Sequence, residues 1–172
     1  MDVEERVRRE YLAGRMHQAA ALARSVLASQ PDRAEVWRLL GRVARHLGDA
    51  AASDAAFERA AVLLPRQMPA PHRVTRERFE ALVEEARVAL RDPEAAVRRG
   101  MRRQGRDDST AAERLVAVRE LPTSGEIEAG VSPDCRWRRQ GDRLVVYQWN
   151  VEHMAGSDQQ IVRQLMRGFV SR

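Results

Sequence analysis

The chain has 172 residues, of which 44% are hydrophobic, enough for one medium domain or two small ones with real cores. It contains no lysine, so its 30 basic side chains are all arginines, and 25 acidic residues leave a net charge of only +5. This balance argues against nucleic acid as the main partner and is typical of a soluble globular protein.

The N-terminus is charged from its second residue and has no apolar core for a signal peptide. No later apolar run approaches the roughly 18 residues of a membrane span. We therefore expect a cytoplasmic protein without a membrane partner. The single cysteine, Cys135, excludes an intrachain disulfide and has no second cysteine to form a metal site.

Residues 1–65 contain a repeat. Gly14 and Gly48 lie 34 residues apart, as do Pro31 and Pro65, and this period is typical of tetratricopeptide-type helical hairpins. The second copy has most of the pattern, at Trp37, Leu40, Gly41, Gly48, Phe57, Ala60 and Pro65. Two hairpins are fewer than the roughly three that such an array needs, so we expect it to pack on the rest of the chain or on a second copy.

Arginines recur on one face of the first helices of these hairpins. In the tetratricopeptide resemblance this is the concave, peptide-binding side, and its residues are Arg8, Tyr11, Arg38, Arg42 and Arg45. One interpretation is a groove for acidic peptides or C-terminal carboxylates. The other, which the usual behaviour of charged helix faces favours, is a solvated surface.

A proline-rich linker is expected at residues 66–75, because three prolines close to one another cannot continue a helix. A second domain then occupies residues 76–172. It begins with a helix capped by Thr75 that ends at about Leu90. The following polar stretch clusters Arg98, Arg99, Arg102, Arg103 and Arg106. It could contact RNA or an acidic partner, but without interleaved aromatic residues a solvated loop is the favoured interpretation.

From Arg114 the hydrophobic pattern changes to strands. The runs RLVAVREL, CRWRR and RLVVYQWNV predict one strand and a hairpin that turns at Gly141 and Asp142, with Val145, Tyr147, Trp149 and Val151 on one face. Ser157 and Gln160 predict a capping box at the start of a last helix. The second domain is therefore an α+β unit in the order helix, strand, β-hairpin, helix.

Three runs in this half resemble the minimal zincin-like metallopeptidase family. They are RFEALVEEARVAL, AVRELPTSGEIEAGVSPD and DRLVVYQWNVEHMAGSDQQIVRQLM, and together they cover about residues 76–166. The resemblance implies that the last helix continues into H-E-x-x-H, in which two histidines bind zinc and the glutamate polarises the attacking water.

The positions that match this motif are Arg167, Gly168 and Ser171. Arginine offers no lone pair, glycine has no base, and serine is a poor zinc ligand. The four histidines, His17, His46, His72 and His153, include no two at ligand spacing, and we expect His153 to be a surface or capping residue. The sequence therefore predicts no metal site and no catalytic residue.

Two explanations of the missing motif remain open. The chain is either a pseudoenzyme that has kept the fold, or a frameshifted product. Codons for Met-His-Glu-Val that lose the dinucleotide CA read Met-Arg-Gly-Phe, as at residues 166–169. In both cases the shortened last helix predicts exposed apolar surface at Phe169 and Val170, which favours a homodimer.

These observations lead to an α+β fold in which tetratricopeptide-like hairpins precede a small zincin-like domain truncated at its metal-site helix. The function we expect is that of a non-catalytic protein-binding or scaffold protein, with a protein or peptide partner held by the repeats and no cofactor. The alternative is a zinc-dependent metallopeptidase whose complete active site needs a longer product or ligands supplied in trans.

Overall fold

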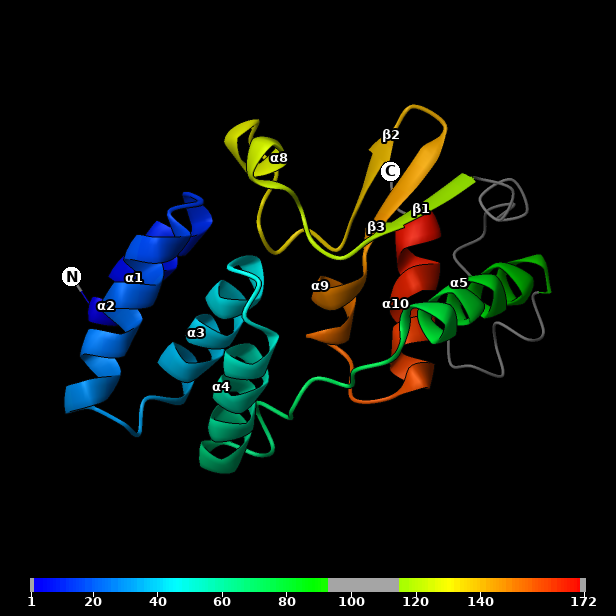
Figure 1. Cartoon of the computed structure of the whole chain (residues 1–172). Helices are drawn as coiled ribbons and strands as arrows, with labels where there is room; N and C mark the ends of the chain where they lie inside the picture. Colours follow the sequence, from blue (N-terminus) through cyan, green and yellow to red (C-terminus); the bar gives the residue numbers. More distant parts are fainter. Residues whose placement is uncertain (1, 93–114, 171–172) are drawn as a thin grey trace. The chain divides into compact units, whose positions relative to one another are not determined.

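A computed structural model describes residues 2–92 and 115–170, and these form two compact units (Figure 1). The first unit comprises residues 1–70 and 122–133, and the second comprises residues 71–121 and 134–172. The described residues contain eight helices and a small three-stranded mixed sheet, which confirms the expected α+β class.

The first unit is built from two antiparallel helical hairpins. Its helices are α1 (Val3–Leu12), α2 (Met16–Ser29), α3 (Ala34–His46) and α4 (Ala50–Leu63). Gly14 and Gly48 occupy the two hairpin turns with φ of +76° and +80°, a conformation that favours glycine because it has no Cβ. The 34-residue spacing of these glycines therefore marks two equivalent turns.

A small residue allows the two helices of the second hairpin to approach closely. A Cβ added at Gly41 of α3 would lie 3.0 Å from the Phe57 ring of α4. The side chains of Val7 and Val43 are fully buried in the same core. The Trp37 indole Nε1 donates to the carbonyl oxygen of Pro31 at 2.8 Å and so ties the start of α3 to the end of α2.

Two short segments complete the packing of this two-hairpin unit. Met68, which is 4% exposed, folds back after α4 and packs with Ala34 and Ala60. Residues 122–133 carry the five-residue helix α8 (Ser124–Glu128) and pack at the hairpin turns, where Ile127 lies against Gly14. Figure 1 shows α8 beyond the turn ends of the hairpins. The first unit thus includes residues 122–133, which were expected to belong to the second domain.

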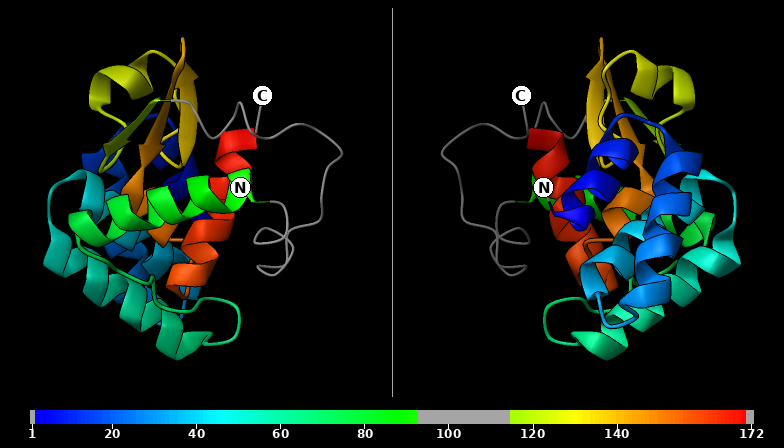
Figure 2. Two further views of the ribbon diagram at one scale, coloured as in Figure 1. Left: turned by 90° about the vertical axis from the view of Figure 1, so that its right-hand side faces the viewer. Right: turned by 90° about the vertical axis from the view of Figure 1, so that its left-hand side faces the viewer.

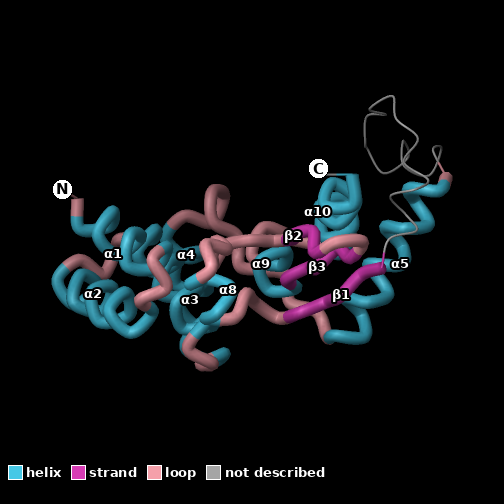
Figure 3. The backbone as a smooth tube through the Cα atoms, turned by 90° about the horizontal axis from the view of Figure 1, so that it is seen from above, coloured by secondary structure: helices cyan, strands magenta, loops and turns pink. Residues whose placement is uncertain are grey.

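The second unit consists of a helix pair and a sheet. In chain order its elements are α5 (Arg76–Arg91), β1 (Leu115–Arg119), β2 (Trp137–Gln140), β3 (Arg143–Tyr147), α9 (Gln148–Glu152) and α10 (Asp158–Val170). The strand order is β1-β3-β2, with β1 parallel and β2 antiparallel to β3 (Figure 3). Figures 1 and 2 show α5 and α10 side by side.

The core of this unit lies between the helix pair and the sheet. Phe79 and Leu82 of α5 meet Leu144 and Val146 of β3 and the apolar side of α10. Phe169 is fully buried in this core, and Val170 is half-buried against it. The expectation of an exposed apolar end was wrong for Phe169, because α10 continues to Val170 and keeps this side chain on its buried stripe.

Two local expectations also need correction. The chain leaves the sheet at Tyr147, so Trp149 and Val151 belong to α9 and do not extend β3. At the start of α10 only half of the capping box forms: the Ser157 hydroxyl accepts from the amide of Gln160 at 3.3 Å, but the Gln160 carboxamide accepts from Gly156 at 2.7 Å. In the described parts of the chain, none of the helices is both long and apolar enough to cross a bilayer.

Candidate functional site

The position expected to hold the zinc motif lies in the last turn of α10. Arg167 is exposed there, whereas Gly168 is buried. A Cβ added at Gly168 would lie 2.9 Å from Cδ2 of the Trp137 ring. Ser171 lies outside the described residues. The indole of β2 therefore fills the space next to α10 where the side chain of residue 168 would begin.

The Trp137 ring also contacts the guanidinium group of Arg136. The guanidinium carbon of Arg136 lies 4.6 Å from the ring centroid, within the range of a cation–π contact. Arg136 Nη1 also donates to Gln164 Oε1 at 3.1 Å, and Gln164 Nε2 donates to the Met154 carbonyl at 2.8 Å. This chain of contacts fixes the indole against α10.

The four histidines are separate from one another in their contacts. His17 is exposed, His46 Nε2 lies 3.3 Å from the Pro133 carbonyl oxygen, and His72 Nε2 lies 2.7 Å from Asp158 Oδ1. His153 is the C-cap residue of α9, as one of the two expectations for it had it, but it is only 7% exposed and so is not a surface residue. Over residues 2–92 and 115–170, no three His, Cys, Asp or Glu side chains are grouped as metal ligands.

The expected peptide-binding face divides into accessible and internal residues. Arg8 is exposed, and Arg38 and Arg42 are half-buried. Tyr11 is 1% exposed, and its ring meets the ring of His46 edge-on at a centroid distance of 5.9 Å. Arg45 is also internal. Three of the five predicted residues therefore remain accessible along α1 and α3.

The buried Arg45 forms an ion pair with Asp54, whose side chain is 48% exposed. Arg45 Nη2 lies 2.5 Å from Asp54 Oδ1 of α4, and the Arg45 side chain is only 6% exposed. The pair connects the two helices of the second hairpin. A buried arginine with this partner contributes to the hairpin itself, so we assign it to structure and not to the accessible face.

The basic cluster from Arg98 to Arg106 lies outside the described residues. The lone thiol is described: Cys135 is half-buried, and its Sγ lies 3.2 Å from the Trp137 carbonyl oxygen. Its own carbonyl accepts from Asn150 Nδ2 at 2.8 Å. These contacts place the cysteine in the connection into β2.

A buried carboxyl group in α9 fixes the chain segment that enters the second unit. Glu152 is 1% exposed, and its Oε1 accepts from Gln148 Nε2 at 2.8 Å and from the Val74 amide at 3.4 Å. Gln148 Nε2 also donates to the Val74 carbonyl at 3.1 Å. The two side chains thus satisfy both backbone groups of Val74, as a neighbouring strand would.

The charge of Glu152 is compensated only in part. Arg73 Nη1 lies 3.2 Å from Glu152 Oε2. Burial raises the pKa of Glu152 above its ordinary value, while the hydrogen bond from Gln148 and the charge of Arg73 act in the opposite direction. The net direction is upward because desolvation of the carboxylate is the largest effect.

A second polar cluster joins α5 to the start of α10. Arg78 Nε and Nη2 both donate to Asp158 Oδ2, at 2.9 and 2.7 Å, and Arg78 Nη1 lies 3.1 Å from Glu85 Oε1. The hydrogen bond from Arg78, followed by that from His72, lowers the pKa of Asp158. The position of Asp158 in the first turn of α10 also suits a negative charge.

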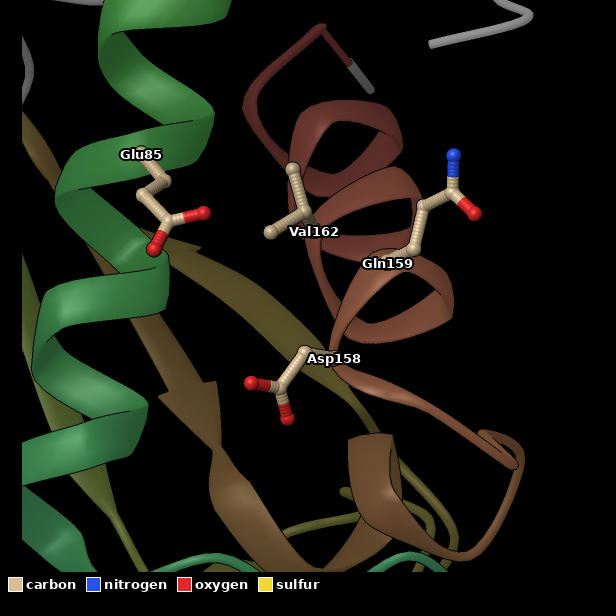
Figure 4. A pocket seen from close by; sticks show the side chains of 4 residues that line it. All are labelled: Glu85, Asp158, Gln159 and Val162. Carbon is tan, nitrogen blue, oxygen red and sulfur yellow. The ribbon is translucent and has the colours of Figure 1, made fainter.

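This cluster borders a pocket of about 230 Å³ between α5 and α10 (Figure 4). Figure 4 shows the carboxylates of Glu85 and Asp158 turned toward the space between the helices, with Val162 beside them and the Gln159 carboxamide pointing away. Arg78 bridges the two carboxylates, and its single positive charge compensates part of their charge. The pocket is smaller than the usual range of ligand sites.

Sequence reasoning did not find these two polar clusters. Asp158 at the first helical position after Ser157 was a detectable signal, because acidic residues are favoured there. Glu152 had no comparable signal. Its partner Arg73 is distant in sequence, and only the fold brings the two together.

Comparisons with known proteins add no assignment: no family model, curated protein sequence or solved structure matches the chain.

Proposed function

We propose that this protein is a non-catalytic protein-binding or scaffold protein. In this proposal its hairpins are of the tetratricopeptide type, and its second unit is a zincin-like relative of minimal metallopeptidases whose zinc motif has been replaced. The partner is an acidic protein segment bound along α1 and α3.

The observation that carries the proposal is the packing of Gly168 on Trp137. In the resemblance, position 168 corresponds to the glutamate that polarises water. Here even a Cβ would lie 2.9 Å from the indole, so this fold has no room for a longer side chain in that direction. Arg167 offers no lone pair for a metal in any conformation. The packing of α10 on β2 therefore suits a glycine at position 168.

The binding role is supported by three arginines on the first helices of the two hairpins. Arg8 is exposed, and Arg38 and Arg42 are half-buried. Guanidinium groups bind carboxylates through two parallel hydrogen bonds, so an acidic peptide fits this surface better than a basic or neutral one. The ion pair of Arg45 with Asp54 connects the two helices of the second hairpin.

A binding measurement tests this role. A fluorescein-labelled octapeptide of glutamate is titrated with the chain, and anisotropy gives the Kd. Replacing Arg8, Arg38 and Arg42 by glutamine is expected to raise the Kd about tenfold or more, which corresponds to about 1.4 kcal/mol. The control is Arg24→Gln, which removes an exposed arginine from α2 and should leave the Kd unchanged. Equal Kd values for all chains would contradict the role of this face.

A second measurement tests the non-catalytic character. Mass spectrometry gives the metal content of protein purified without added metal or a histidine tag. The proposal expects no stoichiometric zinc and no chelator-sensitive cleavage of a casein substrate. About one zinc per chain, together with cleavage that a chelator abolishes, would instead establish the metallopeptidase alternative.

A further inference from the structure

The hairpin unit already holds one segment of its own chain at the end of the candidate binding face. His46 lies four residues after Arg42 on α3, so it continues the same side of that helix. Its Nε2 lies 3.3 Å from the carbonyl oxygen of Pro133, and its ring packs on Tyr11 of α1. Pro133, the last residue of this segment, therefore contacts the same side of α3 that carries Arg42.

The same segment makes an apolar contact with the first hairpin turn. Ile127 of α8 lies so close to Gly14 that a Cβ at Gly14 would be 2.9 Å from Ile127 Cγ2. Glycine is also favoured at position 14 because the backbone there has a φ of +76°. The side chain of Ile127 is half-buried, and none of the residues of α8 is buried completely.

The segment also has hydrogen bonds of its own. The Thr123 amide donates to Glu126 Oε2 at 2.9 Å, and the Glu126 amide donates to Thr123 Oγ1 at 3.2 Å, which completes a capping box. After α8, the amides of Gly130 and Val131 each donate within the segment, at 2.9 Å. The turn between the buried Pro122 and Pro133 therefore has hydrogen bonds of its own, which it can keep when its contacts with the hairpins open.

We propose that residues 122–133 are an internal ligand of the hairpin unit, which an external protein segment of the same chemistry displaces. This inference rests on the proposed binding function and specifies both its partner and its regulation. The partner segment is a short helical turn with its own capping residue, an aliphatic side chain in the place of Ile127, and acidic neighbours like Glu126 and Glu128. The acidic neighbours suit the arginines of α1 and α3.

Binding of a peptide in trans tests the proposal. The probe is a fluorescein-labelled peptide with the sequence of residues 121–134, and the receptors are the full chain and its Ile127→Asp variant. The variant is expected to bind the probe at least tenfold more tightly than the unchanged chain, because its own segment no longer competes. A probe that itself carries Ile127→Asp should bind neither receptor. The control receptor, Val62→Asp, adds the same charge at a residue 70% exposed on α4 and should behave like the unchanged chain.

Equal affinity of the probe for both receptors, or no binding to either while circular dichroism shows them folded, would overturn the proposal. Should the variant not fold, hydrogen exchange on the unchanged chain decides. The amides of Gly130 and Val131 are expected to exchange at least tenfold faster than those within α3. Equal protection would show that the segment is a fixed part of the unit and would also overturn the proposal.

The glutamate octapeptide separates this inference from the proposed function. If the octapeptide binds through the three arginines but the segment probe does not distinguish the two receptors, the binding function stands and the internal ligand is excluded. If the segment probe prefers the Ile127→Asp receptor but the octapeptide binds neither chain, the internal ligand stands and the arginine face is excluded.

Discussion

Gly168 of α10 faces the Trp137 ring of β2 so closely that a Cβ would lie 2.9 Å from Cδ2 of the indole. The guanidinium carbon of Arg136 lies 4.6 Å from the centroid of the same ring. This relationship fixes both how α10 packs on the sheet and which side chains its last turn can accept. It also gives the most direct test of the packing that supports the proposed function.

We expect Gly168→Ala to destabilise the second unit. Overpacking a core costs about 1–3 kcal/mol, which exceeds the roughly 1 kcal/mol that alanine contributes over glycine in a helix. The matched control is Gly125→Ala in α8, where nothing lies within 4 Å of the added Cβ. Urea denaturation followed by circular dichroism measures both changes. Gly168→Ala as stable as the control would contradict the contact.

The turn glycines Gly14 and Gly48 form a natural comparison. Alanine at either position meets a left-handed backbone and should cost about 1–2 kcal/mol. At Gly14 the added Cβ also meets Ile127, whereas at Gly48 nothing lies within 4 Å. Thermal denaturation should therefore show a lower Tm for Gly14→Ala than for Gly48→Ala. Adding Ile127→Ala to Gly14→Ala should reduce this difference in Tm. An unchanged difference would contradict the contact between Ile127 and this turn.

The buried carboxyl of Glu152 predicts a pH dependence with a definite sign. Its pKa is raised by burial above the ordinary value of 4.5, so the folded state binds this proton more tightly than the unfolded state. The stabilisation is fully present below pH 4.5 and is lost as pH rises through the raised pKa. Each unit of difference between the two pKa values corresponds to about 1.4 kcal/mol.

The comparison with Glu152→Gln isolates this group. As pH increases above 4.5, the unfolding free energy of the unchanged chain should fall relative to that of Glu152→Gln, which does not titrate at this position. Urea denaturation at a series of pH values gives the difference. A difference that stays constant with pH, or that changes with the opposite sign, would show that Arg73 compensates the carboxylate completely.

Asp158 predicts the opposite sign. Its pKa is lowered by Arg78 and His72, so its stabilisation is present above the ordinary value of 3.8 and is lost as pH falls through the lowered pKa. Because the Asp158 side chain is 37% exposed, we expect Asp158→Asn to cost less than about 1 kcal/mol at pH 7. A double-mutant cycle with Arg78→Gln measures the coupling, which should decrease in high salt. A coupling near zero in low salt would show that the pair contributes nothing.

Local patterns in the sequence were enough to predict the helical hairpins, the helix cap and the strands, because these depend on interactions between residues close in the chain. The glycine and proline spacing indicated two helical hairpins, and the structure places both glycines in turns with positive φ. Thr75 was predicted to cap α5, and its hydroxyl accepts from the Arg78 amide at 3.2 Å. The change to strand periodicity after Arg114 predicted the three strands. Each of these features depends on backbone conformation or side-chain spacing within a few residues.

Only the tertiary structure decided which residues are accessible and which distant groups meet. Tyr11 and Arg45 matched an exposed face by spacing, yet packing across the hairpins buries them. Glu152 reaches Val74 and Arg73 across more than 70 residues of chain, and Ile127 reaches Gly14 across more than 100. Helical periodicity specifies the direction of a side chain but not what covers it, because burial depends on segments that are distant in the sequence.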